Sequence, residues 1–441
     1  MRINIGFSFL RKQESYSILI KALLNKIPCL RIVSQGMIIV FFLTGLNTTA
    51  QVTESGNFHS KLNGLIVSAP ASGSGLYSIA SPTEKATWET ALTNLFVGNF
   101  STCHTELSSI EYQLTVYTNT SQVPNKTYYI LEKQNAGTNY WGIYVYNPNA
   151  CNSNLVIQSP HAKYDSNTGQ EGALVFTHAD AFFFMVNGTH RCDHSSFSSC
   201  SGTTSSCGTS QNFRISDMSH NDNSIFQVTT SYLLNQSTSH YFVQLHGFGK
   251  QPTDPSVIMS NGTRNAPVQD YIGAIQQNLY AIDNNLDFKI AHIDISWTRL
   301  IGFTNTQGRL INGESAPCTN SASSTNGRFI HLEQEKPLLR QDSTKWAIMA
   351  EAIKLSFDCS VSIEESPEKS ISIYPNPTNG LIMIDGDYKS ATIINLLGQN
   401  VKNFPSSHKL ISISNLKSGS YLLKIELKSG VIIVEKVVLY H

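Results

Sequence analysis

The chain has 441 residues, with 31 lysines and arginines against 31 aspartates and glutamates, so its formal net charge at pH 7 is zero. This balance, with no basic stripe and no acidic tail, argues against a nucleic-acid-binding protein. The length is sufficient for two or three domains and a large buried core. Only 14% of the residues are charged, which indicates a surface made soluble by hydroxyl and amide groups, as in many extracellular proteins.

Residues 1–50 are predicted to be a secretory signal. Basic residues up to Arg31 precede an apolar run, Met37–Leu46, and small and polar residues follow as far as Ala50. A basic region, an apolar stretch of roughly 7–15 residues and small residues at the cleavage site define such a signal. We place cleavage after Ala50, with Met37 as a second candidate for the start of translation. The run is shorter than the ~20 residues of a membrane span, so no transmembrane segment is expected in the mature chain.

The cysteines are consistent with export. Eight are present, and three of them, Cys192, Cys200 and Cys207, lie in a loop rich in Ser, Gly and Thr, where we expect a disulfide. No Cys-x-x-Cys pair occurs in the sequence, so a cysteine zinc cluster is not expected. Because Cys29 precedes the predicted cleavage, one mature cysteine must be free or paired elsewhere.

Residues 52–361 are predicted to form one α/β domain with a β-rich N-terminal part. That part contains one predicted helix, 84–97, and a hairpin of strands at 127–133 and 139–147. From residue 155 onward strands alternate with helices, which predicts a mixed sheet with helices on both faces. The strands are expected at 155–158, 182–188, 241–248, 257–260, 288–295 and 328–334, and helices after Glu171, at 268–282 and at 343–357.

A polar, proline-containing linker at 362–370 precedes a change in pattern. Residues 371–441 consist of short β-rich runs separated by turns about every ten residues, without helical periodicity. This pattern predicts a small all-β sandwich.

Several short motifs follow one another along this tail. They are Tyr374-Pro375-Asn376-Pro377 with Thr378-Asn379-Gly380, then Asn395-Leu396-Leu397-Gly398-Gln399, Leu416 with Gly419-Ser420-Tyr421, and Lys436-Val437-Val438. In these motifs the tail resembles the type A C-terminal sorting domain of the type IX secretion system of Bacteroidetes-type bacteria. The resemblance implies that the type IX machinery is a partner of residues 371–441, and that the protein is released or attached to the cell surface.

The main candidate site begins where an apolar strand ends. Leu155–Gln158 runs into Ser159-Pro160, His161 follows at once, and Glu171 stands ten positions later at the start of a helical run. The strand at 241–248 likewise carries His246 near its end. Reacting groups sit at the carboxyl ends of such strands, and two imidazoles with one carboxylate are a catalytic zinc ligand set. We therefore predict one zinc ion held by His161, Glu171 and His246.

A zinc site of this kind needs a proton carrier. The metal polarises a carbonyl and lowers the pKa of bound water, and a second carboxylate then moves a proton from that water to the leaving amine. Glu333, near the end of the strand at 328–334, is the predicted base, with Glu335 in reserve.

Three motifs of the site follow one another along the chain. They are Pro160-His161 with Glu171, Leu245-His246-Gly247, and Leu332-Glu333 with the downstream Arg340. In these motifs residues 155–357 resemble the poly-γ-glutamate hydrolase family, relatives of the zinc carboxypeptidases. The resemblance implies a carboxypeptidase-like fold and the metal chemistry. It departs in the turn Ala162–Ser166 and over 180–225, so the γ-glutamyl substrate is not carried over.

Substrate binding is assigned to arginine, whose forked donors suit a carboxylate. Arg191 lies between the two histidine motifs, where the resemblance implies such an arginine, and Arg340 matches the family's downstream arginine. Arg214 and Arg264 are alternatives. A rival metal site would use His190, His194 and His220 with Asp193 or Asp217.

The sequence therefore predicts a secreted, zinc-dependent hydrolase of amide bonds that acts on a peptide, a glutamyl polymer or a wall-derived fragment. A serine hydrolase is disfavoured, because no G-x-S-x-G elbow occurs. The alternative from another class is a non-catalytic cell-surface adhesin or binding protein on the same fold.

Overall fold

A computed structural model describes residues 51–357 and 371–441, except 397, 406–407, 429 and 431. The predicted signal and the predicted linker at 362–370 lie outside the described residues. No helix in the described ranges combines the length and apolar character needed to cross a bilayer.

The α/β domain is built on a ten-stranded mixed sheet. Its strands are β1 (Val52–Gly56), β2 (Tyr112–Asn119), β3 (Lys126–Lys133), β4 (Ile143–Tyr146), β5 (Asn152–Ser159), β6 (Ala181–Val186), β9 (Tyr241–Phe248), β10 (Val257–Ser260), β11 (Phe288–Ile290) and β12 (Phe329–Glu335). They lie in the order β1-β2-β3-β4-β6-β5-β9-β12-β10-β11. The central strands β6, β5, β9 and β12 run parallel, whereas β4 and β10 pair with this core antiparallel.

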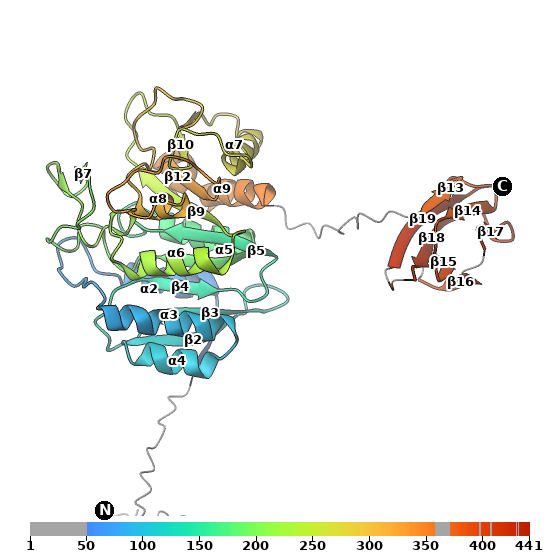
Figure 1. The fold of residues 1–441 in the computed structure, drawn as a ribbon, viewed down its shortest axis with the longest axis horizontal. Coiled ribbons are helices and arrows are strands. Elements are labelled where there is room, and N and C mark those ends of the chain that lie inside the picture. Colours follow the sequence, from blue (N-terminus) through green and yellow to red (C-terminus); the bar gives the residue numbers. More distant parts are fainter. Residues whose placement is uncertain (1–50, 358–370, 397, 406–407, 429, 431) are drawn as a thin grey trace, which may run out of the picture. The chain divides into compact units, whose positions relative to one another are not determined.

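Helices cover both faces of this sheet (Figure 1). One core contains residues of α2 (Phe58–Val67), α5 (Thr168–His178), α7 (Tyr271–Ile282) and α9 (Ser343–Ser356). The other contains residues of α3 (Pro82–Phe96), α4 (Phe100–Ser108), α6 (Ile225–Gln236) and α8 (Thr306–Ile311). Neighbouring strand residues divide between the two cores, as Val156 and Ile157 do, because side chains of a strand alternate between its faces. The predicted mixed sheet with helices on both faces is confirmed.

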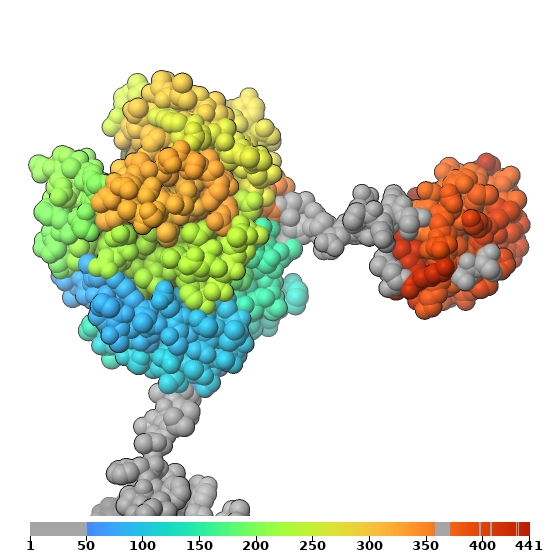
Figure 2. Space-filling view, in the orientation of Figure 1, coloured from blue at the N-terminus to red at the C-terminus, as the bar shows by residue number. Residues whose placement is uncertain are grey.

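The sheet order places early and late segments of the chain at opposite edges. In the space-filling view, α3 and α4 (blue) lie at one end of the α/β domain and the yellow and orange segments around β10 and α7 lie at the other (Figure 2). The strands that end at the candidate site, β5, β9 and β12, are neighbours in the middle of the sheet.

The N-terminal part contains more helix than predicted. The helix at 84–97 is present as α3, whose start is set by Pro82 and by a capping box between Ser81 and Glu84. The sequence pattern missed α2 and α4. Both are short, α2 has Gly64 in its middle, and α4 is rich in Ser and Thr, all of which weaken helix propensity. The helices form because each buries one face.

Two disulfides hold the long segment between β6 and α6. The bond Cys192–Cys207 closes the loop that contains a short hairpin of β7 (Thr203–Thr204) and β8 (Gln211–Asn212). The bond Cys200–Cys318 ties the same loop to the segment after α8. The predicted disulfide in this loop is confirmed, and the free cysteine among the described residues is the buried Cys103.

The C-terminal residues form two small antiparallel sheets. One contains β13 (Ser372–Tyr374), β14 (Leu381–Asp385) and β17 (Leu410–Ser412), and the other contains β15 (Ser390–Ile394), β16 (Asn400–Pro405), β18 (Gly419–Glu426) and β19 (Ile432–Leu439). Residues from both sheets share one apolar core, which includes Ile382, Ile393 and Ile425. The predicted all-β sandwich is confirmed.

Candidate metal centre

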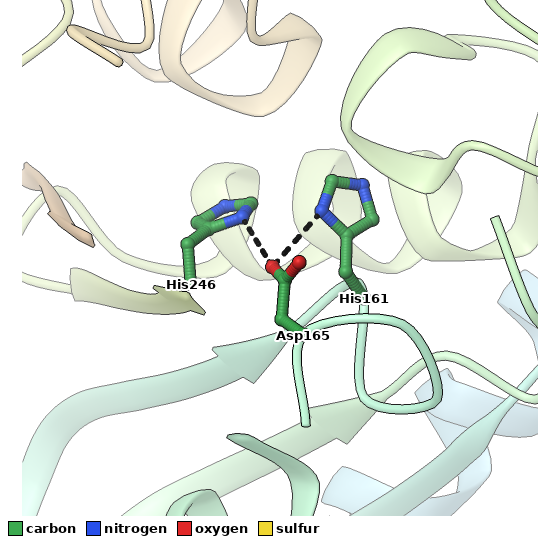
Figure 3. A group of neighbouring side chains, drawn as sticks. All are labelled: His161, Asp165 and His246. Atoms are coloured by element: carbon green, nitrogen blue, oxygen red, sulfur yellow. Dashed lines mark ion pairs between the residues drawn. The ribbon is translucent and has the colours of Figure 1, made fainter. Parts of the chain in front are cut away.

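The turn after β5 places the side chains of His161 and Asp165 next to each other. The backbone N–H of Asp165 donates to the carbonyl of His161 at 2.8 Å, which sets the two residues one helical turn apart. Asp165 Oδ2 lies 3.3 Å from His161 Nδ1 and 3.3 Å from His246 Nδ1. Figure 3 shows this carboxylate between the two imidazoles. The exposed fractions are only 2%, 5% and 3% for His161, Asp165 and His246.

The parallel pairing of β9 and β12 supplies the other side of the site. Glu333 is paired in register with His246, and His331 with Gln244. Because side chains two apart share a strand face, His331 and Glu333 point the same way, while Leu332 faces the apolar core on the other side. A cavity of about 600 Å³ is lined by His161, Asp165, His246, His331 and Glu333, together with the loops at 203–206 and 298–305.

The tautomer of His246 follows from its partner Gln244. The Gln244 amide NH₂ donates to Gln158 Oε1 at 2.9 Å and to Gln307 Oε1 at 3.3 Å. Its Oε1 is therefore the acceptor that faces His246 Nε2 at 2.7 Å, and it also accepts from Asn305. His246 must donate from Nε2, which leaves a lone pair on Nδ1. Burial lowers the pKa of His246 to about 4, so the ring is neutral near pH 7.

Asp217 orients His161 in a similar way. Its Oδ1 lies 2.8 Å from His161 Nε2 and 3.1 Å from His220 Nδ1, and its Oδ2 accepts from Arg191 Nε at 3.1 Å. Burial alone would raise the pKa of Asp217, but Arg191 and His220 hold it well below its ordinary value. As an ionised acceptor, Asp217 keeps the proton of His161 on Nε2 and turns the Nδ1 lone pair toward Asp165.

Three electron-pair donors thus converge with no proton assigned between them. They are His161 Nδ1, Asp165 Oδ2 and His246 Nδ1, and their mutual geometry is compatible with a bound metal ion. His161 Nδ1 is buried and has no hydrogen-bond partner. Such a cluster is unfavourable unless a proton or a metal cation lies in it. Burial alone would lower the pKa of His161, but Asp217 and Asp165 raise it, so a metal ion would displace a proton from this ring. With both imidazoles neutral, the two rings and one carboxylate, each imidazole held by an outer hydrogen bond, fit a zinc-type ion.

The structure does not bring Glu171 into this group. Glu171 lies in the first turn of α5, fully buried, and its Oε2 accepts from Gln334 Nε2 at 3.1 Å. Gln334 follows Glu333 on β12 and therefore points to the opposite face of the sheet. Burial raises the pKa of Glu171 to about 8, so its carboxyl is largely neutral at pH 7. The carboxylate between the histidines is that of Asp165.

Glu333, the predicted proton carrier, lies on the cavity wall. Its Oε2 is buried without a partner, and burial together with the carboxylate of Asp165 raises the pKa of Glu333 to about 8. The reserve candidate, Glu335, does not line the cavity. It pairs with Lys250 at 3.1 Å.

Arg191 lines the cavity but is already engaged. Its Nε and Nη2 both donate to Asp217 Oδ2, and its guanidinium lies 5.2 Å from the centre of the Tyr164 ring. This arginine is therefore positioned to hold Asp217.

Arg340 does not line the cavity. It is buried and donates to the backbone carbonyls of Gln334, Ser166 and Phe248 at 3.0, 2.5 and 3.4 Å. A Cβ on Gly247 would lie 2.0 Å from its Cζ, so this glycine leaves the space that the guanidinium fills. Arg340 thus joins β9, β12 and the turn after His161.

We expect Arg340→Met to lower the free energy of unfolding by roughly 3 kcal/mol or more, because three carbonyls, two of them in buried contacts, lose a charged donor. Urea denaturation measures the change. The matched control is Arg299→Met, since Arg299 is one-third exposed and pairs mainly with Asp254. Equal stability of the Arg340 variant and the wild type would contradict this structural role.

The alternative arginines predicted from the sequence are engaged in hydrogen bonds within the protein. Arg214 donates to Ser195 and Gln211, and Arg264 donates to the carbonyls of Ala291, Asp294 and Trp297. Neither His190 nor His194 belongs to a group of three metal-compatible side chains in the described part of the chain. His220 and Asp217 of the rival site instead join His161.

Sequence reasoning missed Asp165, Gln244 and His331. The spacing of four between His161 and Asp165 was a usable signal, because a turn of helix puts such residues on one side. The alternation of β9 and β12 also pointed to Gln244 and His331, two positions before His246 and Glu333. The role of Asp217 depends on a loop of 38 residues between β6 and α6 whose path no local pattern specifies.

Comparison with known proteins identifies the C-terminal sandwich. Residues 372–440 match the family described as the secretion system C-terminal sorting domain. Among curated proteins, no sequence matches the chain.

Two solved structures similar to this chain carry peptidase names. One is a provisionally assigned carboxypeptidase A from Shewanella denitrificans OS-217, with 11% identity, a TM-score of 0.27 and coverage of 54% of this chain and 62% of that chain. The other is a provisionally assigned metallopeptidase from Shewanella amazonensis SB2B, with 12% identity, a TM-score of 0.25 and coverage of 58% and 90%. The first match thus spans less than two thirds of the carboxypeptidase chain.

The predicted sorting domain is confirmed by the family match. Such a domain directs its protein to the type IX secretion machinery, which is the partner of this sandwich. Residues 372–440 are a secretion sorting domain, and the protein is exported to the cell surface or released.

Proposed function

We propose that the protein is an exported, zinc-dependent hydrolase of amide bonds, with His161, Asp165 and His246 as the zinc ligands and Glu333 as the proton carrier. One observation supports this most strongly. Two imidazole Nδ1 atoms and one carboxylate oxygen converge at 3.3 Å contacts on the wall of a cavity that also contains an unpartnered glutamate.

In the proposed reaction, different groups of the protein carry out separate parts of the hydrolysis. Zinc held by the three ligands would polarise the substrate carbonyl and acidify a water molecule. Glu333 accepts a proton from the attacking water and returns it to the leaving amine, and a pKa near 8 suits both transfers at neutral pH. Asp217 and Gln244 hold the two ligand imidazoles in their orientation, so they need not reorganise during the reaction.

The charges on the cavity wall favour a peptide or a wall-derived fragment over a glutamyl polymer. The arginines on the wall, Arg191 and Arg299, are paired with Asp217 and Asp254. The rest of the wall combines hydroxyl groups at 203–206 with apolar side chains such as Phe248 and Leu300. A polyanion would need an excess of positive charge, which the lining residues do not provide.

The proposal is tested by incubating the full mature chain with a peptide pool and reading new peptide termini by mass spectrometry. We expect cleavage that stops after treatment with 1,10-phenanthroline and returns when zinc is added. Zinc-loaded protein that generates no new termini would contradict the proposal and favour the non-catalytic surface protein. Cleavage that persists without metal would also contradict it.

Asp217→Asn should weaken zinc binding roughly 10–100-fold, the usual cost of losing an outer-shell partner of a ligand histidine. A chelator competition titration measures the zinc affinity. The control is Asp193→Asn, because Asp193 is equally buried but accepts from the backbone of Gly75 and Tyr77 outside the cavity. A similar loss of zinc affinity in both variants would indicate a general effect on folding and contradict the orienting role.

A further inference from the structure

One imidazole of the cavity has no role in the metal centre described above. His331 lies on β12, two residues before Glu333, and lines the cavity with an exposed fraction of 3%. Its Nδ1 is buried without a hydrogen-bond partner. Its Nε2 lies 3.9 Å from Glu333 Oε1, which is too long for a hydrogen bond. Buried polar groups without partners are rare in proteins and call for an explanation.

The surroundings of the ring decide where its proton lies. A Cβ on Gly302 would lie 3.1 Å from Cγ and Cδ2 of the His331 ring and 3.3 Å from Nδ1, so this loop packs over the ring, where the buried Nδ1 finds no acceptor. A buried N–H without an acceptor is less tolerated than an acceptor without a donor. The proton is therefore expected on Nε2, the nitrogen on the side of Glu333. The ring then presents an N–H group beside the proposed proton carrier.

The other imidazole and guanidinium groups on the cavity wall are already used within the protein. His161, Arg191 and His220 hydrogen-bond to Asp217, and His220 also bonds to Thr304. His246 hydrogen-bonds to Gln244, and Arg299 hydrogen-bonds to Asp254. Among these cavity-lining rings and guanidinium groups of the described chain, His331 is the one without a hydrogen-bond partner inside the protein. An amide substrate develops negative charge on its carbonyl oxygen as water adds, and this oxygen needs a donor.

We propose that His331 is a substrate-contacting catalytic residue whose Nε2–H donates a hydrogen bond to the carbonyl oxygen of the scissile amide as it becomes an oxyanion. Water adds to the carbonyl carbon, Glu333 takes the water proton, and the electron pair of the C=O π bond moves to the oxygen that His331 binds. When the C–N bond breaks, that pair re-forms the carbonyl and the proton passes from Glu333 to the amine. The inference rests on the proposed hydrolase function.

Inorganic phosphate, a tetrahedral anion, serves as the probe, since it resembles the charged species without requiring a known substrate. Its affinity for the zinc-loaded full mature chain is measured by calorimetry in the wild type, in His331→Leu and in His331→Gln. The Leu variant has no donor, whereas Gln retains an N–H group. Zinc affinity is measured in parallel by chelator competition, and thermal unfolding establishes that each variant is folded. His331→Ala replaces the Leu variant if that variant does not fold.

We expect phosphate affinity to fall roughly 10–100-fold in His331→Leu, as for loss of a hydrogen bond to a charged group, and to stay within about threefold in His331→Gln. Zinc affinity should be equal in all three proteins. Unchanged phosphate affinity in the Leu variant, or no phosphate binding by the zinc-loaded wild type, would overturn the inference.

A joint loss of zinc and phosphate would also overturn it. His246, His331 and Glu333 have a geometry compatible with metal binding as well, and that result would make His331 a ligand. A wild type that binds no zinc would instead refute the proposed metal centre itself, so the two failures can be told apart.

Discussion

Glu333→Gln is expected to lower the rate of amide hydrolysis roughly 10²–10⁴-fold, the range that a positioned acid–base group contributes. Glutamine has nearly the same shape but accepts no proton. Because Glu333 Oε2 has no partner in the protein, the substitution breaks no internal hydrogen bond at that atom. Peptide cleavage followed by mass spectrometry measures the rate, and zinc content should equal that of the wild type.

Glu335→Gln provides the matched control for this experiment. Glu335 is also buried and on β12, but it pairs with Lys250 away from the cavity. We expect its hydrolysis rate to stay close to the wild-type value in folded protein. A Glu333→Gln enzyme as active as the wild type would rule out Glu333 as the proton carrier. An inactive Glu335→Gln enzyme would show that any change in this strand has the same effect.

Asp165→Ala should weaken zinc binding by more than the roughly 10–100-fold cost of losing an outer-shell partner, because it removes one of three proposed ligands. The carboxylate oxygen Oδ2 of Asp165 contacts both ligand imidazoles. Glu171→Gln is the comparison, since Glu171 is the carboxylate that the sequence favoured and its carboxyl lies with Gln334. Chelator competition should give wild-type zinc affinity for this second variant.

The opposite pattern of zinc affinities would contradict Asp165 as a zinc ligand. If Glu171→Gln lost zinc and Asp165→Ala kept it, Glu171 would be the carboxylate ligand, as the sequence motif predicted. Loss in both variants would mean that Glu171 also supports the centre. Loss of zinc in Asp165→Ala with wild-type affinity in Glu171→Gln is the pattern that agrees with Asp165 as the one carboxylate ligand.

The fold was largely predictable because its strands are strongly apolar and its turns are marked. The strand at 241–248 was predicted with the bounds of β9, and α9 begins at Ser343 as expected. The short helices α2 and α4 were missed, since their stability comes from burial against the sheet. The strand predicted at 288–295 is shorter in the structure, where β11 ends at Ile290.

The candidate site was predictable only in part. His161, His246 and Glu333 stand at strand ends, and strand ends can be located from apolar runs. The third ligand could not be chosen from spacing alone, because the sequence does not say which face of the sheet a helix covers. Glu171 starts α5 on one face while His246 and Glu333 point to the other. The substrate-binding roles of Arg191 and Arg340 stay predictions, and their internal partners could not be foreseen because these come from distant segments.

The central claim is most directly tested by the zinc content of the purified mature chain, measured by mass spectrometry of the metal, beside His246→Ala and the control His178→Ala. His178 is a half-exposed histidine that pairs with Glu351. We predict one zinc ion per chain in the wild type and in the His178 variant, and little or none in the His246 variant. Equal zinc in all three proteins, or a wild type that holds no zinc, would contradict the proposed metal centre.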